Sequence, residues 1–366
     1  MAKRGENIYK RKDGRWEGRY KNGFKPDGRT RYSSVYGATY SEVKVLLNTK
    51  RAEHKSTCLK CNFSFGELSE LWLESIVHNV RESTYSNYGM KLEKHIIPYF
   101  GAIYYEKLTV KIFNDFIADK LSSGLSAGYV ADICRVIKSI TKFAHKKLGY
   151  ADKAELLSLP KYEKKERKML TTVQQNLLTN YLTDNISPSN LGILISTVTG
   201  MRIGELCALK WSDIDLEKRI ITVSKTMQRI KNIDGETATK IVITPPKSKT
   251  SAREIPVPDV LYSYLKAMQC DDDCYVLTGK KIFAEPRTMQ YCFKAVLKKA
   301  GVPQVNFHAL RHMFATKCVD VGVDVKTLSE ILGHSSVELT LNRYVHSSMD
   351  RKRNCMKLFS DNVCAV

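Results

Sequence analysis

The chain has 366 residues, of which 43% are hydrophobic and 27% charged, a composition ordinary for a globular protein of two or three domains. Its longest apolar stretch, near 191–198, is far shorter than the ~18 residues that cross a bilayer, and the basic N-terminus lacks the apolar core of a secretory signal. Fifty-nine lysines and arginines against 38 acidic residues give a net charge of +21. Nucleic acid is the first candidate partner for such a charge, and an acidic membrane surface is the second.

Ten cysteines are scattered through the chain, and reduced thiols in a cytoplasm are the simplest interpretation. Cys58 and Cys61 form a lone CxxC pair, whereas a zinc site needs two further ligands and no second CxxC follows. Two thiols in a linker are the favoured interpretation, with metal binding as the minor alternative. The sequence thus predicts no metal and no other cofactor.

Residues 1–55 have the pattern of a small module with three strands and one helix. Strands are expected at 7–12, 16–20 and 31–36, with turns at Asp13-Gly14 and Pro26-Asp27-Gly28, and Thr39 with Glu42 opens the helix. Residues 1–60 hold 16 lysines and arginines against 6 acidic residues, a net charge of +10. The first sixth of the chain therefore carries nearly half of the excess charge.

Basic and aromatic side chains are interleaved on these strands. The candidate DNA-binding residues are Lys10, Arg11, Arg15, Arg19 and Lys21, beside Tyr9, Trp16 and Tyr20. Such a surface suits contacts with the DNA backbone and grooves, and a merely solvated basic surface is the alternative.

Residues 63–158 are predicted to form an all-helical domain. Ser64 and Glu67 make a capping box for its first helix, and helical periodicity continues over 82–100, 109–122 and 126–148. The highly charged stretch 161–168 follows Pro160 and is expected to be an interdomain linker.

Residues 169–355 are predicted to form a third, mainly helical domain with a small antiparallel sheet. Thr171 and Gln174 open its first helices, and Gly200 can end them in a left-handed conformation. The expected strands are 219–228, 240–244 and 253–257, and the expected later helices are 259–268, 287–300, 308–321, 324–332 and 336–343. The predicted fold class is therefore multidomain α+β.

Four local patterns in this third domain carry reactive side chains. They are Arg202 in TGMRIGEL, His308 and Arg311 in HALRH, His334 in LGHSS, and Tyr344 in NRYVH. Each alone is most simply a surface or structural residue. Together they supply what attack on a phosphodiester without a metal requires: guanidinium groups for the phosphate oxygens, histidines for proton transfer, and a tyrosine nucleophile.

These motifs, in this order, resemble the Arg…His-x-x-Arg…His…Tyr signature of the tyrosine recombinases, the phage integrase family. Arg202 and His308 are 106 residues apart, and Tyr344 follows His334 by ten, as in that family. The resemblance extends more weakly to the integrases of temperate phages and conjugative transposons. It implies an arm-type DNA-binding domain at 1–55, a core-binding, SAM-like domain at 63–158 and a catalytic domain at 169–355.

The resemblance also implies a lysine in a β-hairpin, expected here at Ile241–Val257. Lys249 is the favoured residue and Lys247 the alternative. The lysine would protonate the leaving 5′ oxygen, or otherwise only contact a phosphate. Glu205 matches an acidic position that supports the site.

The implied reaction is site-specific recombination of DNA that integrates, and also excises, a mobile element or prophage. Tyr344 would form a 3′-phosphotyrosine, a partner strand would attack it, and neither metal nor ATP would be needed. The implied partners are double-stranded DNA at core and arm attachment sites, a homotetramer on two duplexes, and accessory bending or excision factors, in a bacterial cytoplasm and at its nucleoid, without membrane contact. A type IB topoisomerase and a non-catalytic DNA-binding protein are the rival interpretations.

Overall fold

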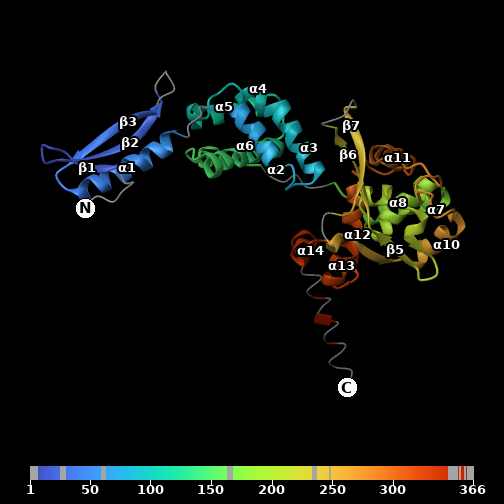
Figure 1. Cartoon of the computed structure of the whole chain (residues 1–366). Helices are drawn as coiled ribbons and strands as arrows, with labels where there is room; N and C mark the ends of the chain where they lie inside the picture. Colours follow the sequence, from blue (N-terminus) through green and yellow to red (C-terminus); the bar gives the residue numbers. More distant parts are fainter. Residues whose placement is uncertain are drawn as a thin grey trace. The chain divides into compact units, whose positions relative to one another are not determined.

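The computed structural model describes residues 7–24, 30–58, 63–162, 168–232, 237–246 and 249–344, with isolated positions beyond. The chain divides into two compact units, Met1–Lys164 and Lys165–Val366 (Figure 1). The predicted fold class is confirmed: an N-terminal three-stranded sheet with a helix, a helical region, and a mainly helical second unit with small sheets. The finer division at 1–55, 63–158 and 169–355 stays a prediction.

The N-terminal sheet consists of β1 (Ile8–Lys10), β2 (Trp16–Phe24) and β3 (Thr30–Gly37), antiparallel in that order. Helix α1 (Tyr40–Cys58) lies along the sheet (Figure 1). Its Val43 and Leu47 bury against Ile8 in a small core. The predicted turn at 26–28 lies outside the described residues.

The face of this sheet away from α1 is organised by strand register. Glu17 of β2 lies opposite Tyr9 on one side and Tyr36 on the other. Because side chains alternate along a strand, Arg15 and Arg19 share the face of Glu17, whereas Trp16 packs against Tyr40 of α1. This open face therefore combines arginines and tyrosines around one carboxylate.

The rest of the first unit is helical, as predicted. Its helices are α2 (Phe65–Ile76), α3 (Glu82–Lys91), η1 (Leu92–Ile96), α4 (Ile97–Phe100), η2 (Tyr105–Lys107), α5 (Val110–Ser122), α6 (Ala127–Leu148) and η3 (Ala154–Leu156). The capping box of Ser64 and Glu67 is present at the start of α2. Phe100 packs against Phe65, Phe113 and Phe116 in the centre of the core.

The helices of the second unit also follow the sequence prediction closely. They are α7 (Thr172–Asp184), α8 (Pro188–Thr199), α9 (Ile203–Cys207), η4 (Trp211–Asp213), α10 (Asp259–Met268), α11 (Pro286–Lys299), α12 (His308–Asp320), α13 (Val325–Leu332) and α14 (Val337–Tyr344). The capping box of Thr171 and Gln174 is formed. Gly200 ends α8 with φ of 68°, the left-handed conformation that was expected.

The strands of the second unit differ from the prediction in their pairing. They are β4 (Ile214–Asp215), β5 (Ile220–Val223), β6 (Thr226–Lys231), β7 (Thr239–Thr244) and β8 (Arg253–Pro256). The expected single strand 219–228 is two strands, since β5 pairs with β4 and β8 while β6 pairs with β7. The predicted hairpin Ile241–Val257 is therefore wrong: its two arms, β7 and β8, belong to different sheets.

Glu17 gives the N-terminal sheet a pH-sensitive centre. Its side chain is 3% exposed and accepts hydrogen bonds from Ser34 Oγ (2.7 Å), Arg11 Nη1 (3.0 Å) and Arg19 Nε (3.0 Å). The bond from Ser34 is the largest influence on the pKa of Glu17, which falls from 4.5 to about 2 although burial opposes the change. Arg19 and Tyr9 lower this pKa further.

We expect Glu17→Gln to lower the free energy of unfolding of this sheet by about 1.5–3 kcal/mol at neutral pH, the usual contribution of a hydrogen bond to a charged group. Hydrogen exchange of β2 amides in the full chain should report the loss. The folded-state pKa is depressed, so the contribution of Glu17 is complete above about pH 4.5 and fades as pH falls towards 2. A difference between the two proteins that stays constant across this window would contradict the assignment.

Candidate active site

One cavity of about 450 Å³ in the second unit collects five of the predicted site residues. They are Arg202, Glu205, His308, Arg311 and His334. The same cavity is lined by Thr226 and Gln228 of β6, by Pro246 and Ser251, and by Gly333, Ser335 and Leu339. Residues separated by more than one hundred positions in the sequence thus meet at one place.

Arg202 is placed by a sharp change of backbone direction. Gly200 is followed by Arg202 in an extended conformation, directly before α9. A Cβ at Gly200 would lie 2.6 Å from Phe314 and 2.8 Å from Leu332, so only glycine fits this turn. The guanidinium of Arg202 donates to Glu205 Oε1 (2.6 Å) and to the carbonyl oxygen of Gly333 (3.2 Å). Its side chain remains 35% exposed and borders the cavity.

Glu205 is a buried carboxylate held between two arginines. Its Oε1 accepts from Arg202, and its Oε2 accepts from Arg253 Nη2 (2.9 Å) and from the backbone N–H of Arg202 (3.0 Å). Burial raises the pKa of Glu205, but the charges and hydrogen bonds of Arg253 and Arg202 outweigh it and hold the pKa below its usual range. Glu205 is therefore an anion that holds the two arginines in place, and its supporting role in the reaction stays a prediction.

Arg311 lies deep in the wall of the cavity, 2% exposed. Its Nη1 donates to the carbonyl oxygen of Gly200 (3.0 Å) and its Nη2 to that of Leu332 (2.7 Å). Both carbonyls stand at the C-terminal ends of helices, where the helix dipole attracts a cation. The guanidinium is thus locked in one orientation beside the cavity.

His308 begins α12, one helical turn before Arg311, and is exposed. Both line the cavity, as their spacing on one helical face predicted. The ring of His308 meets the buried His312 edge to face, with centroids 4.6 Å apart. Sequence reasoning assigned nothing to His312, although its i+4 spacing from His308 on α12 could have indicated the contact.

His334 stands on the corner between α13 and α14. Gly333 ends α13 with φ of 64°, and the ring Nδ1 of His334 lies 2.7 Å from Thr340 Oγ1 of α14. Because a hydrogen bond to one ring nitrogen sets the orientation and tautomer of the imidazole, Thr340 fixes how His334 faces the cavity. The same contact joins the corner to α14, which ends at Tyr344.

For the two remaining candidates, Lys249 and Tyr344, the structure describes the backbone alone. Lys249 opens the short helix η5 (Lys249–Ser251), and Tyr344 is the last residue of α14. Pro246 and Ser251, on either side of Lys249, line the cavity, as does Leu339 of α14. The side chains of Lys249 and Tyr344 and the whole of Lys247 lie outside the described residues, so their roles stay predictions.

The arm candidates occupy both faces of the N-terminal sheet. The guanidinium groups of Arg11 and Arg15 lie over the ring of Tyr36, and that of Arg19 lies over Tyr9. Lys10 instead pairs in register with Trp16, on the face that packs on α1.

The fifth arm candidate, Lys21, lies in β2 and pairs in register with Tyr32 of β3. Its side chain lies outside the described residues. The arm assignments stay predictions.

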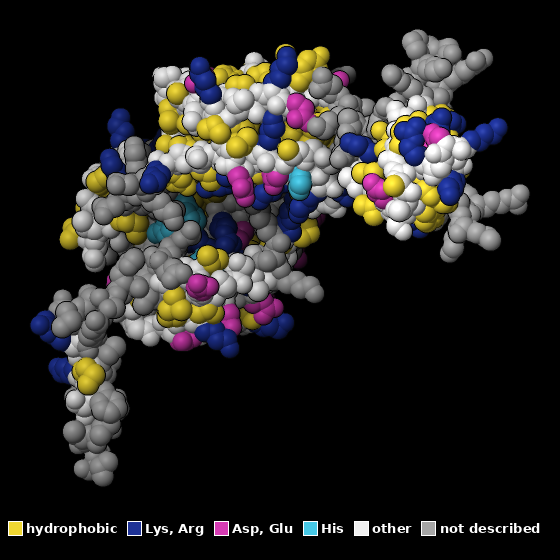
Figure 2. Space-filling view, turned by 90° about the vertical axis from the view of Figure 1, so that its left-hand side faces the viewer, with side chains coloured by type: hydrophobic (Ala, Val, Ile, Leu, Met, Phe, Trp, Pro, Cys, Tyr) yellow, Lys and Arg dark blue, Asp and Glu magenta, His cyan; other side chains and the backbone are white. Residues whose placement is uncertain are grey.

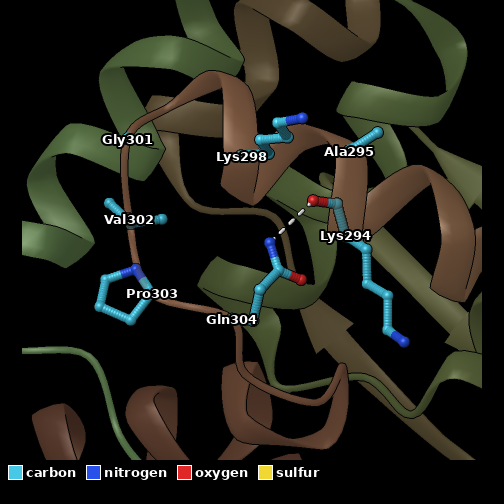
Figure 3. Close-up of a pocket in the computed structure, with 7 residues that line it drawn as sticks. All are labelled: Lys294, Ala295, Lys298, Gly301, Val302, Pro303 and Gln304. Carbon is cyan, nitrogen blue, oxygen red and sulfur yellow. Dashed lines mark hydrogen bonds between the residues drawn. The ribbon is translucent and has the colours of Figure 1, made fainter.

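A second, shallower cavity of about 660 Å³ shares no residue with the first. It is lined by Lys294, Ala295, Lys298, Gly301, Val302, Pro303 and Gln304 (Figure 3). Gln304 donates to the carbonyl oxygen of Lys294 across it (3.0 Å). Its two lysines are its only ionisable side chains, and none of the predicted site residues lines it.

Over the residues that the structure describes, no group of three or more His, Cys, Asp or Glu side chains could hold a metal ion. Cys61 lies outside these residues, so the CxxC pair is not tested. Within the described ranges, no helix has both the length and the apolar character needed to cross a membrane.

Known proteins resemble this chain in sequence and in fold. A tyrosine recombinase XerC-like protein of Caldanaerobacter subterraneus subsp. tengcongensis is 28% identical over 342 residues, covering 81% of this chain and 83% of that protein. The ICEBs1 integrase of Bacillus subtilis is 23% identical over 312 residues, with the same coverage of 81% and 83%. In fold, the chain resembles the Tn1549 transposon integrase in complex with a circular intermediate DNA, with a TM-score of 0.64, 21% identity, and coverage of 80% of this chain and 99% of that one.

Two family descriptions match the sequence directly. The N-terminal SAM-like domain of phage integrases matches residues 64–121, within the helical region of the first unit. The phage integrase family itself matches residues 163–351, more than half of the chain and the whole of the cavity described above. The chain therefore belongs to the phage integrase family.

Proposed function

We propose that this chain is the integrase of a mobile genetic element, which cuts and rejoins DNA at specific sites with Tyr344 as the nucleophile. As a member of its family, the chain is a tyrosine-type site-specific recombinase. The observation that carries the residue assignments is the cavity in which Arg202, Arg311, His308 and His334 meet.

The cavity is suited to a scissile phosphate. Arg202 and Arg311 hold the two non-bridging oxygens and offset the negative charge that grows on them in the pentacoordinate transition state. The hydroxyl oxygen of Tyr344 attacks the phosphorus, its proton passes to His308, and the bond to the 5′ oxygen breaks. Lys249 donates a proton to that departing oxygen.

The products of this step are a 3′-phosphotyrosine and a free 5′ hydroxyl. Attack by the 5′ hydroxyl of a partner strand remakes the phosphodiester and releases Tyr344. Because the phosphotyrosine keeps the energy of the broken bond, the cycle needs no ATP. Arg202 and Arg311 supply the charge stabilisation for which other enzymes use a metal ion. Exchange of two strands in each of two rounds calls for a tetramer on two duplexes.

The charge of the chain supports a DNA partner. Lysine and arginine side chains are distributed over much of the visible surface (Figure 2). We infer that the open face of β1–β3 holds arm sites, that residues 63–158 hold the core site together with the catalytic domain, and that accessory bending proteins assist. The bacterial cytoplasm is the expected location.

Replacing Arg202 or Arg311 by lysine should slow cleavage of a nicked suicide substrate by about 10²- to 10³-fold, the loss typical of one oxyanion donor. An ammonium group is a point charge and cannot reproduce the planar fork that contacts two oxygens. Single-turnover rates at saturating protein measure the effect. Arg219→Lys is the matched control, because Arg219 pairs with Asp259 (2.7 Å) in the same unit and does not line the cavity. Near-normal rates for both site variants would mean that these arginines only position DNA.

Tyr344→Phe and Lys249→Ala should fail in different ways. The first removes the attacking oxygen, so no covalent adduct should appear on a denaturing gel with any substrate. The second leaves the nucleophile intact, and a substrate with sulfur in place of the scissile 5′ oxygen should restore its cleavage, because a thiolate leaves without a proton. If sulfur instead restores cleavage by Lys247→Ala, Lys247 rather than Lys249 is the acid.

Transfer of the cut strand to a second duplex would exclude the topoisomerase alternative.

Deleting residues 1–55 should spare cleavage of a core-site suicide substrate but abolish integration that needs distant arm sites. More selectively, Arg15→Gln and Arg19→Gln should each weaken arm-site binding and reduce its salt dependence by about one phosphate contact. Lys44→Gln is the matched control, because Lys44 lies on α1, which packs on the other face of the sheet, and is not an arm candidate. Unchanged integration by the truncated protein would refute the arm assignment.

A further inference from the structure

Arg253, the first residue of β8, is not among the site residues that the sequence predicted. Its side chain is 5% exposed, and each of its guanidinium nitrogens donates to a different segment. Nε bonds the carbonyl oxygen of Ile331 (2.5 Å), Nη1 that of Ser251 (3.0 Å), and Nη2 the carboxylate of Glu205 (2.9 Å). These segments are the end of α13, the turn after Lys249, and helix α9.

The charges around Glu205 give Arg253 a specific consequence. A carboxylate paired with Arg202 alone would neutralise the guanidinium that is to hold the scissile phosphate. With Arg253 present, one carboxylate is shared by two guanidinium groups, and the cluster keeps one net positive charge. Arg253 is buried whereas Arg202 is 35% exposed at the cavity, so the surplus charge is presented through Arg202.

The path of Arg253 is fixed by close packing against the corner that carries His334. A Cβ at Gly333 would lie 3.0 Å from Arg253 Cδ, 3.1 Å from its Nη1 and 3.2 Å from Ser251 Cα. Gly333 also offers its carbonyl oxygen to Arg202 (3.2 Å) and to Ser251 Oγ (3.5 Å). The buried arginine therefore cannot move away from Glu205 without disturbing several parts of the cavity wall.

We propose that Arg253 is a positioning residue for DNA cleavage, which neutralises Glu205 so that the charge of Arg202 remains available to the scissile phosphate. This inference rests on the proposed role of Arg202. Arg253 does not line the cavity and would act through the carboxylate of Glu205.

The test compares full-length Arg253→Met with the parent protein on two suicide substrates, one with a normal scissile phosphate and one with an uncharged methylphosphonate there. On phosphate, Arg253→Met should slow single-turnover cleavage by about 10- to 100-fold at saturating protein, less than the loss of a direct donor. On methylphosphonate, whose single non-bridging oxygen carries no formal charge, the ratio of parent to variant should fall close to one. Equal slowing on both substrates would overturn the proposal, because a purely structural defect does not depend on the charge of the substrate.

A second substitution sharpens the distinction. In the Arg253→Met background, Glu205→Gln removes the unbalanced negative charge but keeps an oxygen that can accept from Arg202. The double variant should cleave the phosphate faster than Arg253→Met alone, whereas cumulative damage to the fold would make it equal or slower. Arg219→Met, which removes a surface ion-pair arginine, should behave as the parent protein on both substrates.

Two further proteins keep the outcome unambiguous. Should Arg253→Met not fold, as judged by circular dichroism and core-site binding, Arg253→Gln, which removes the charge but keeps a hydrogen-bond donor, is measured on the same substrate pair, and the same difference between substrates is required of it. Arg202→Met is run in parallel: if its defect is as large on methylphosphonate as on phosphate, the proposed role of Arg202 fails. If Arg202→Met is selective and the Arg253 variants are not, only the present inference fails.

Discussion

The buried carboxylate of Glu205 is the interaction on which the rest of the site depends. It receives hydrogen bonds from two guanidinium groups and one backbone N–H, and so ties the start of α9 to the start of β8. Removing one partner of a buried ion pair commonly costs about 3–5 kcal/mol, because the other charge is left without compensation. The same contacts that stabilise this part of the fold therefore set the orientation of the Arg202 side chain and the net charge of the cluster to which it belongs.

Arg311 is oriented by backbone carbonyl oxygens at helix ends rather than by a carboxylate. Gly200 and Leu332 leave carbonyl oxygens without intrahelical partners where α8 and α13 end, and the two terminal nitrogens of Arg311 fill both positions. The left-handed residues Gly200 and Gly333 are what bring these helix ends together, since each turns the chain sharply after its helix. A cation held in this way is oriented before any phosphate arrives, which is the condition for strong stabilisation of a transition state.

The sequence anticipated features that depend on neighbouring residues and missed those that depend on distant ones. Capping boxes at Ser64 and Thr171 are encoded within four residues, and the shared face of His308 and Arg311 follows from helical spacing. Strand pairing is not local: the β-branched run at 219–228 gives no sign that the chain leaves one sheet for another between β5 and β6. Arg253 was missed for the same reason, because its partners come from three segments up to 78 positions away.

The site thus has two parts with different physical origins. Arg202, Glu205 and Arg253 are bonded to one another, and Arg311 is held by two backbone carbonyls, so that the four form a frame around the proposed position of the phosphate. The candidate nucleophile and acid belong to two other elements, α14 and η5. Thr340 of α14 bonds His334, while Ser251 of η5 donates to Gly333 and accepts from Arg253. Substitutions in the frame should consequently weaken stabilisation of the negative charge on the phosphate. Substitutions on α14 or η5 should instead affect nucleophilic attack or protonation of the leaving oxygen. Under the proposed mechanism, one cavity serves both strand cleavage and its reversal, because the two reactions pass through the same transition state and the frame meets its charge in both directions.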